Sequence, residues 1–158
     1  MDYELRLRAV LPGDLPLFYG HHLDMAARLM VAFAAKVPED YEAFAAKWAR
    51  NLADPNTLIR TIEVDGEIAG NVSKFPQFDK PSIGYWLGRK FWGRKIATRA
   101  VQAFLPAIPD RPLCARVAKD NVGSLRVLAH CGFAIVGEDK GFAEARGQEI
   151  EEFILELQ

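Results

Sequence analysis

The sequence has few cysteines and no long hydrophobic run. Its two cysteines, Cys114 and Cys131, are too few for a disulfide framework and lack C-x-x-C spacing. The apolar run at residues 29–35 is far shorter than the ~20 residues that cross a bilayer. The first residues are acidic and lack the basic-then-apolar pattern of a signal peptide. We therefore expect a cytoplasmic protein without a membrane partner.

An excess of one charge sign is also absent. Twenty Lys and Arg residues stand against 21 Asp and Glu residues, so the net charge is -1. No global field would draw the molecule onto nucleic acid. With 158 residues, 50% hydrophobic and 26% charged, the chain has enough apolar surface for a core and is too apolar for disorder. We expect residues 1–158 to form a single domain.

The spacing of apolar residues changes along the chain, which predicts a mixed α/β protein. Apolar residues at every second position predict strands, and those at every third or fourth position predict helices. Asp65-Gly66 is a strong hairpin signal, Pro38 breaks a helical region, and Asp14 is a candidate helix cap. In chain order we expect a strand at 5–9, a helical arm over 22–53, strands at 57–64, 67–74 and 82–87, a helix at 94–105, a strand at 113–118, a helix at 121–130, and strands at 133–137 and 150–157.

Residues 89–99 form a basic loop between an expected strand and an expected helix. Five of these eleven residues are basic and none is acidic. A helix N-terminus offers free backbone N–H groups and the positive end of the helix dipole, so this loop is a candidate anion site. The same run is also typical of a solvated basic turn. A nucleic-acid-binding cluster is a third reading, but it leaves the next segment unexplained.

Residues 119–133 contain a helix with recognisable ends. Asn121 can cap its N-terminus, Ser124 lies three residues further on, and Gly132 stands where a left-handed C-cap belongs. Taken alone, this pattern is typical of any well-capped helix.

Together and in this order, the two segments resemble the GNAT superfamily of acyl-CoA-dependent N-acetyltransferases. Residues 92–98 (WGRKIAT) are similar to the family's pyrophosphate loop, and Asn121-x-x-Ser124 followed by Gly132-Phe133 is similar to its second CoA-side helix. An aromatic residue commonly opens this loop in the branch of the ribosomal-protein alanine acetyltransferases, and the sequence resembles that branch more closely. The resemblance implies an α/β (α+β) fold: a mixed, mostly antiparallel sheet of six to seven strands, with helices on both faces and splayed central strands.

The resemblance also implies acetyl-CoA as co-substrate and no metal. The Leu87 N–H would polarise the thioester carbonyl and hold the developing oxyanion. The N–H groups of residues 93–98 would take the pyrophosphate, and the adjacent strand and the second helix would contact the pantetheine arm. The implied CoA-binding residues are Trp86, Leu87, Trp92, Gly93, Arg94, Lys95, Ile96, Ala97, Thr98, Asn121 and Ser124.

Two positions depart from the family pattern. Lys95 replaces the central glycine of the loop, so its side chain either turns outward and adds charge to the phosphate site or weakens CoA binding. Leu128 stands where many members carry a tyrosine that protonates the leaving thiolate. These departures motivate an alternative to catalysis, namely a catalytically silent CoA-binding or interaction module on the same fold.

The acceptor amine must lose a proton before it attacks, and its pKa decides how strong a base the protein must supply. At pH 7 an α-amine is about one seventh neutral, whereas a lysine amine is neutral about four times in ten thousand. The strand at 82–87 carries no carboxylate, which favours an easily deprotonated primary amine, such as a protein N-terminus or a small molecule. Tyr85 through water, His21 and His22 are candidate proton relays. The alternatives are a core or lining aromatic for Tyr85, and two exposed imidazoles at a loop–helix junction for the histidines.

The acceptor itself is not identified by the sequence, and neither is a homodimer partner. The two adjacent histidines lack further ligands, so we expect no metal site. Acids slightly outnumber bases in residues 14–54, which weakly favours a cationic acceptor. The acids are Asp14, Asp24, Glu39, Asp40, Glu42 and Asp54, against Arg28, Lys36, Lys47 and Arg50.

Overall fold

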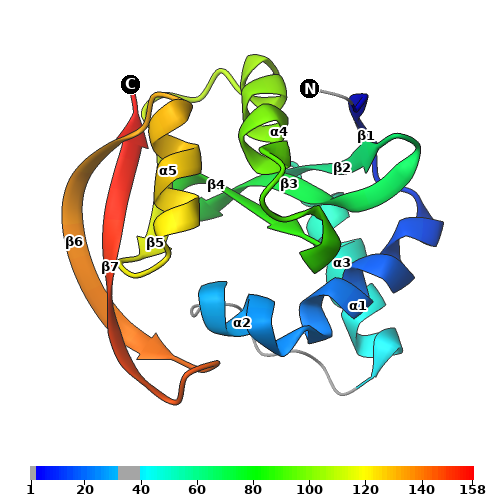
Figure 1. Cartoon of the computed structure of the whole chain (residues 1–158), viewed down its shortest axis with the longest axis horizontal. Helices are drawn as coiled ribbons and strands as arrows, with labels where there is room; N and C mark the ends of the chain where they lie inside the picture. The colour runs from blue at the N-terminus through cyan, green and yellow to red at the C-terminus, as the bar shows by residue number, and fades with distance from the viewer. Residues whose placement is uncertain (1–2, 32–39) are drawn as a thin grey trace.

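A computed structural model describes residues 3–31 and 40–158 of the chain. Within this part the strands form one seven-stranded sheet in the order β1-β2-β3-β4-β5-β7-β6 (Figure 1). Neighbouring strands are antiparallel except β4 and β5, so the mixed and mostly antiparallel sheet is confirmed. The strands are β1 (Leu5–Ala9), β2 (Leu58–Val64), β3 (Glu67–Gln77), β4 (Lys80–Leu87), β5 (Leu113–Ala118), β6 (Ala134–Ala143) and β7 (Gln148–Leu157).

Helices cover both faces of the sheet, as expected. Ile59 and Ile62 of β2 point to opposite faces because they are an odd number of residues apart. Ile62 belongs to the core that includes α4 and α5, whereas Ile59 packs with α1 and α3. None of the described helices is long and apolar enough to cross a membrane. The helices are α1 (Leu15–Leu23), α2 (Met25–Val31), α3 (Tyr41–Ala53), α4 (Ile96–Phe104) and α5 (Val122–His130), with short 3-10 turns at Pro12–Asp14, Arg89–Phe91 and Leu105–Ala107.

The helical arm thus contains α2 and α3 and begins inside α1. Asp40 caps α3, since its carboxylate accepts a hydrogen bond from the Ala43 N–H at 2.7 Å. Pro38, the expected break, lies outside the described residues. Asp14 occupies the N-cap position of α1, as expected, but its side chain makes no capping hydrogen bond there. It is buried and its carboxylate accepts hydrogen bonds from Arg8, the Leu11 N–H and the Thr61 hydroxyl.

The sheet splays between β4 and β5. β3 and β4 pair from Gln77 and Lys80 to Gly70 and Leu87, but β4 and β5 pair only at Ser82 and Cys114. The C-terminal end of β4 therefore lacks a strand partner on its β5 side. This opening between the central strands was expected from the family resemblance.

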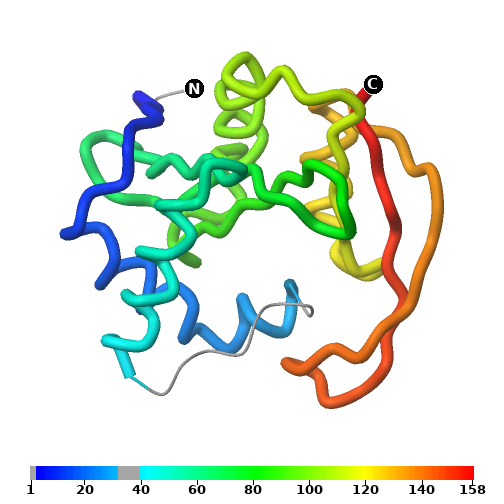
Figure 2. The backbone as a smooth tube through the Cα atoms, turned by 180° about the vertical axis from the view of Figure 1, so that it is seen from behind, coloured from blue at the N-terminus to red at the C-terminus, as the bar shows by residue number. Residues whose placement is uncertain are grey.

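β6 is longer than the sequence predicts. Its second half is polar and mostly exposed, so it lacks the apolar alternation that marks a half-buried strand. Pairing with β7 continues to Ala143 and Gln148, and an ion pair joins Lys140 to Glu149 at 3.8 Å. The resulting long hairpin curves away from the rest of the sheet, and its tip comes back beside α2 in two opposite views (Figures 1 and 2).

Candidate active site

A cavity of about 560 Å³ lies where the end of β4 meets α2, α4 and α5. Most of the residues expected from the sequence line it, although they come from separate segments of the chain. Arg94, His21 and His22 are expected site residues that do not. The expected residues that line the cavity are Tyr85, Trp86, Leu87, Trp92, Gly93, Lys95, Ile96, Ala97, Thr98, Asn121 and Ser124.

The loop before α4 has the backbone shape of an anion cradle. Gly93 and Lys95 adopt left-handed conformations with φ of 74° and 61°, and Lys95 is the N-cap residue of α4. Its side chain makes no capping hydrogen bond. The N–H groups at the start of a helix have no intrahelical partners, so those of residues 96–98 are available at the wall of the cavity. This loop fits a diphosphate.

Two features of this loop were not foreseen. Lys95 occupies the conformation that glycine adopts most readily, which accounts for the glycine at this position of the family pattern. Arg94 turns toward the N-terminal strand instead of the cavity. Its backbone carbonyl accepts a hydrogen bond from the Tyr3 hydroxyl at 2.9 Å, and its guanidinium lies 5.4 Å from the centre of the Tyr3 ring.

Tyr85 bridges the opening between β4 and α5. Its hydroxyl lies 2.8 Å from the Ser124 hydroxyl. Asn121, which is buried, holds the start of α5 by accepting a hydrogen bond from the Ser124 N–H at 3.2 Å. Burial raises the pKa of Tyr85, against a smaller opposing effect of the hydrogen bond with Ser124. The phenol therefore keeps its proton at neutral pH and can act as a donor.

The Leu87 peptide is held at the edge of β4. The Gly88 N–H donates to the Ala69 carbonyl in β3 at 2.9 Å. Because successive N–H groups of an extended chain point to opposite edges, the Leu87 N–H points toward the β5 side, where the sheet is open. The Leu87 carbonyl accepts a hydrogen bond from the Trp92 indole at 3.1 Å, so the loop before α4 fixes this peptide.

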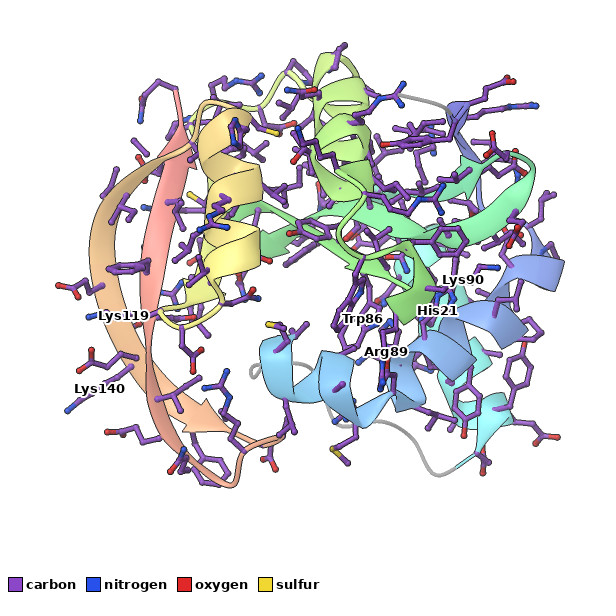
Figure 3. The ribbon with its side chains drawn as sticks, in the orientation of Figure 1. His21, Trp86, Arg89, Lys90, Lys119 and Lys140 are labelled. Carbon is purple, nitrogen blue, oxygen red and sulfur yellow. The ribbon has the colours of Figure 1, made fainter. Side chains whose placement is uncertain are left out.

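His21 and His22 belong to the last turn of α1 and contact Trp86 at the end of β4. Figure 3 shows His21 near Trp86. The His22 ring stacks on the Trp86 indole, with centroids 4.1 Å apart and planes at 17°. The Trp86 indole donates to the His21 carbonyl at 3.2 Å. Burial, and to a lesser extent the charges of His21, Arg28 and Lys47, lowers the pKa of His22 to about 4. Both histidines thus hold Trp86 in place, and neither side chain lines the cavity.

Several lining residues were missed by the sequence analysis. Those on α5 recur three and four residues apart from Gly123 to His130, so a helical projection of this segment would have placed them on one face. Those on α2 carry no such signal, because only folding brings that helix to the cavity. Among the described lining residues, the charged side chains are all basic and none is acidic. The missed residues are Ala27, Met30, Val31, Phe91, Gly123, Arg126, Val127 and His130.

Four of the acids in residues 14–54 make contacts within the fold. Asp14 pairs with Arg8 at 2.7 Å, and Asp24 pairs with Arg89, the first residue of the basic loop. Asp54 accepts a hydrogen bond from the Asn56 N–H at 2.8 Å, and Asp40 caps α3. Glu39 lies outside the described residues, and none of the others lines the cavity. Their number therefore gives no support to a cationic acceptor.

Known proteins share both the sequence pattern and the fold. The family model described as an acetyltransferase (GNAT) domain matches residues 4–134. No curated protein sequence matches the chain significantly. The fold is similar to that of a ribosomal-protein-alanine N-acetyltransferase from Brucella melitensis, with a TM-score of 0.81 and 16% identity over 96% of this chain and 98% of that one.

Two further solved structures contain coenzyme A. The spermidine N-acetyltransferase from Vibrio cholerae, in complex with CoA and spermine, gives a TM-score of 0.79 and 16% identity over 96% of this chain and 95% of that one. Mycobacterium smegmatis RimJ, in complex with CoA-disulfide, gives a TM-score of 0.77 and 22% identity over 97% of this chain and 81% of that one. These likenesses agree with the family match over most of the sequence. The chain belongs to the GNAT acetyltransferase family.

Proposed function

We propose that residues 1–158 form one domain that transfers an acetyl group from acetyl-CoA to a primary amine by direct attack. The observation that carries this proposal is a shared cavity: the free N–H groups at the start of α4 and the open edge of β4 both face it. An anion site beside an unpaired strand edge suits a ligand with a diphosphate at one end and an amide-bearing arm. Acetyl-CoA has both features and supplies an acyl group activated as a thioester.

The start of α4 and the α5 side of the cavity bind the co-substrate in this proposal. The N–H groups of residues 93–98 take the diphosphate, and Lys95 adds a positive charge. Arg126 adds a second charge from α5, a role that the sequence did not indicate. Asn121 and Ser124 set the start of α5 and offer polar contacts to the pantetheine arm. Arg94 contributes its N–H rather than its guanidinium, which lies over Tyr3.

The edge of β4 carries the chemical step. The Leu87 N–H is aimed at the open side and would hold the negative charge that develops on the acyl oxygen. The Tyr85 hydroxyl is protonated and faces the same cavity, so it is the candidate donor to the leaving thiolate in place of the residue at position 128. Leu128 is buried in the core and cannot take that role.

The amine must lose a proton, and the described lining of the cavity has no carboxylate to accept it. This supports an α-amine or another amine of low pKa as the acceptor. The α2 wall is apolar, formed by Ala27, Met30 and Val31. We therefore propose an amine with uncharged neighbours, as in a peptide N-terminus or a small amino compound, over a polyamine. His21 and His22 remain predicted proton relays, and a pH–rate profile of His21→Ala tests that role.

The alternative is a CoA-binding module without catalysis, which the apolar residue at position 128 favours. The two are separated by following thiol release from acetyl-CoA with a panel of peptides, amino compounds and spermidine. We expect turnover with at least one α-amine and weaker turnover with spermidine. Saturable CoA binding without turnover on any acceptor would support the silent module, and Tyr85→Phe would then leave every measured property except stability unchanged.

A further inference from the structure

The helix α2 is held by few apolar contacts. It has seven residues, of which only Ala27 is buried, and Leu29 and Met30 are 43% and 42% exposed. A helix this short is not stable by itself. Its N-terminus is fixed by Asp24, whose carboxylate accepts a hydrogen bond from the Ala26 N–H at 3.1 Å. Since α2 supplies one wall of the cavity, something must also fix its other end.

Arg146 makes that second attachment from a distant part of the chain. It lies in the turn between β6 and β7, and its side chain is only 18% exposed. Its Nε donates to the Leu29 carbonyl at 3.0 Å. Its two terminal nitrogens donate to the Asp120 carboxylate at 2.6 and 2.8 Å. The hairpin tip lies beside α2 in both views of the backbone (Figures 1 and 2).

The chemistry of these contacts suits a positioning role. Leu29 is in the last described turn of α2, and its carbonyl accepts the hydrogen bond from the Arg146 Nε. The planar guanidinium can use one edge for this carbonyl and another for a carboxylate, which a lysine cannot do. Asp120 directly precedes Asn121, the cap of α5. One side chain therefore joins α2, the start of α5 and the β6–β7 hairpin.

We propose that Arg146 is a positioning residue that fixes the α2 wall and thereby sets the affinity for the acceptor amine. The part about the acceptor rests on the proposed function, whereas the attachment of α2 does not. Arg146 is not among the lining residues of the cavity, so it acts through α2 rather than by touching a substrate. CoA binding, which we assign to α4 and α5, should depend on it little.

Kinetics of Arg146→Ala test the proposal. We expect the KM of the acceptor to rise about tenfold, while kcat and the Kd of CoA change less than about twofold. Arg146→Lys should give an intermediate KM, because it keeps the charge but not the forked contact. Lys140→Ala is the matched control: it removes a cation from the same hairpin, is 69% exposed and pairs only with Glu149 in the described structure. It should leave the KM unchanged.

Hydrogen exchange of the α2 amides provides a readout without activity. In Arg146→Ala we expect exchange in residues 25–31 to accelerate about tenfold, with no change in α4. Unchanged α2 exchange would overturn the attachment even if no acceptor had been found. Faster exchange with an unchanged acceptor KM would overturn the specificity role. An equal loss of CoA affinity and acceptor affinity would show a general structural effect and would also overturn it.

Discussion

Lys95→Gly isolates the strain stored in the loop before α4. Lys95 has φ of 61°, a left-handed conformation that costs a residue with a Cβ about 1–2 kcal/mol. Glycine removes that cost, but ordering a glycine on folding costs about 0.5–1 kcal/mol more, because glycine has greater freedom in the unfolded chain. The free energy of unfolding should therefore rise by about 0.5–1 kcal/mol. For a domain of this size, the Tm should rise by about 2–3 °C.

Gly93→Ala is the opposite change in the same loop. Gly93 has φ of 74°, and a Cβ built there would meet no atom within 4 Å. The substitution therefore adds backbone strain without a clash, and the free energy of unfolding should fall by about 1 kcal/mol. If both substitutions shift stability in the same direction, the loop does not carry strain of the kind we infer.

Urea denaturation without ligand measures the stability change of both variants. Calorimetry with CoA then shows how much the charge of Lys95 contributes to binding, apart from the backbone strain. Lys95→Gly removes one cation near the proposed diphosphate site, so we expect CoA affinity to fall less than about tenfold. A Lys95→Gly variant that is less stable than the parent would refute the strain. A larger loss of affinity would show that the lysine itself contacts the phosphate.

Three other substitutions probe the site and its supports. Asn121→Ala should weaken CoA binding in calorimetry, while loss of the cap costs about 1 kcal/mol without unfolding the protein; unchanged affinity would remove Asn121 from the site. Gly70→Ala should destabilise by more than about 3 kcal/mol, because its Cβ would lie 2.0 Å from the Trp86 carbonyl oxygen; a near-normal urea midpoint would contradict the close approach of β3 and β4. The pKa of His22 is about 4 when folded and about 6.5 when unfolded, so this group's stabilisation is complete above pH 6.5 and is lost as the pH falls toward 4. Between pH 7 and pH 5 that loss is about 1.5–2 kcal/mol, and His22→Gln should abolish it in urea titrations at the two pH values; an equal pH dependence in the variant would rule out His22 as its source.

The elements around the CoA loop were predictable from the sequence because local signals agree there. Asp65-Gly66 forms the expected hairpin turn, with positive φ at both residues. β5 spans Leu113–Ala118 as predicted, since all of its residues except Arg116 are apolar and buried. Asn121 caps α5 through the Ser124 N–H, as its position implied. Eleven of the expected site residues line one cavity, and these residues followed from the family resemblance rather than from local signals alone.

The acceptor side was not predictable, because distant segments create it. Nothing in the sequence near Leu29 indicates that Arg146, far along the chain, will bind its carbonyl. Charge counting over residues 14–54 treated Asp14 as available, whereas folding buries it beside Arg8. The stacking of His22 on Trp86 was not predicted either, because it depends on how α1 docks on β4.

Titration calorimetry of the purified protein with coenzyme A tests the central claim most directly. We predict saturable binding with one site per chain, and a Tm that rises by about 5–8 °C when the ligand is at 100 times its Kd. Raising the salt concentration should weaken this binding, because the diphosphate is held by charges and backbone dipoles. An absence of both heat and a Tm shift at millimolar coenzyme A would contradict the assignment of the cavity.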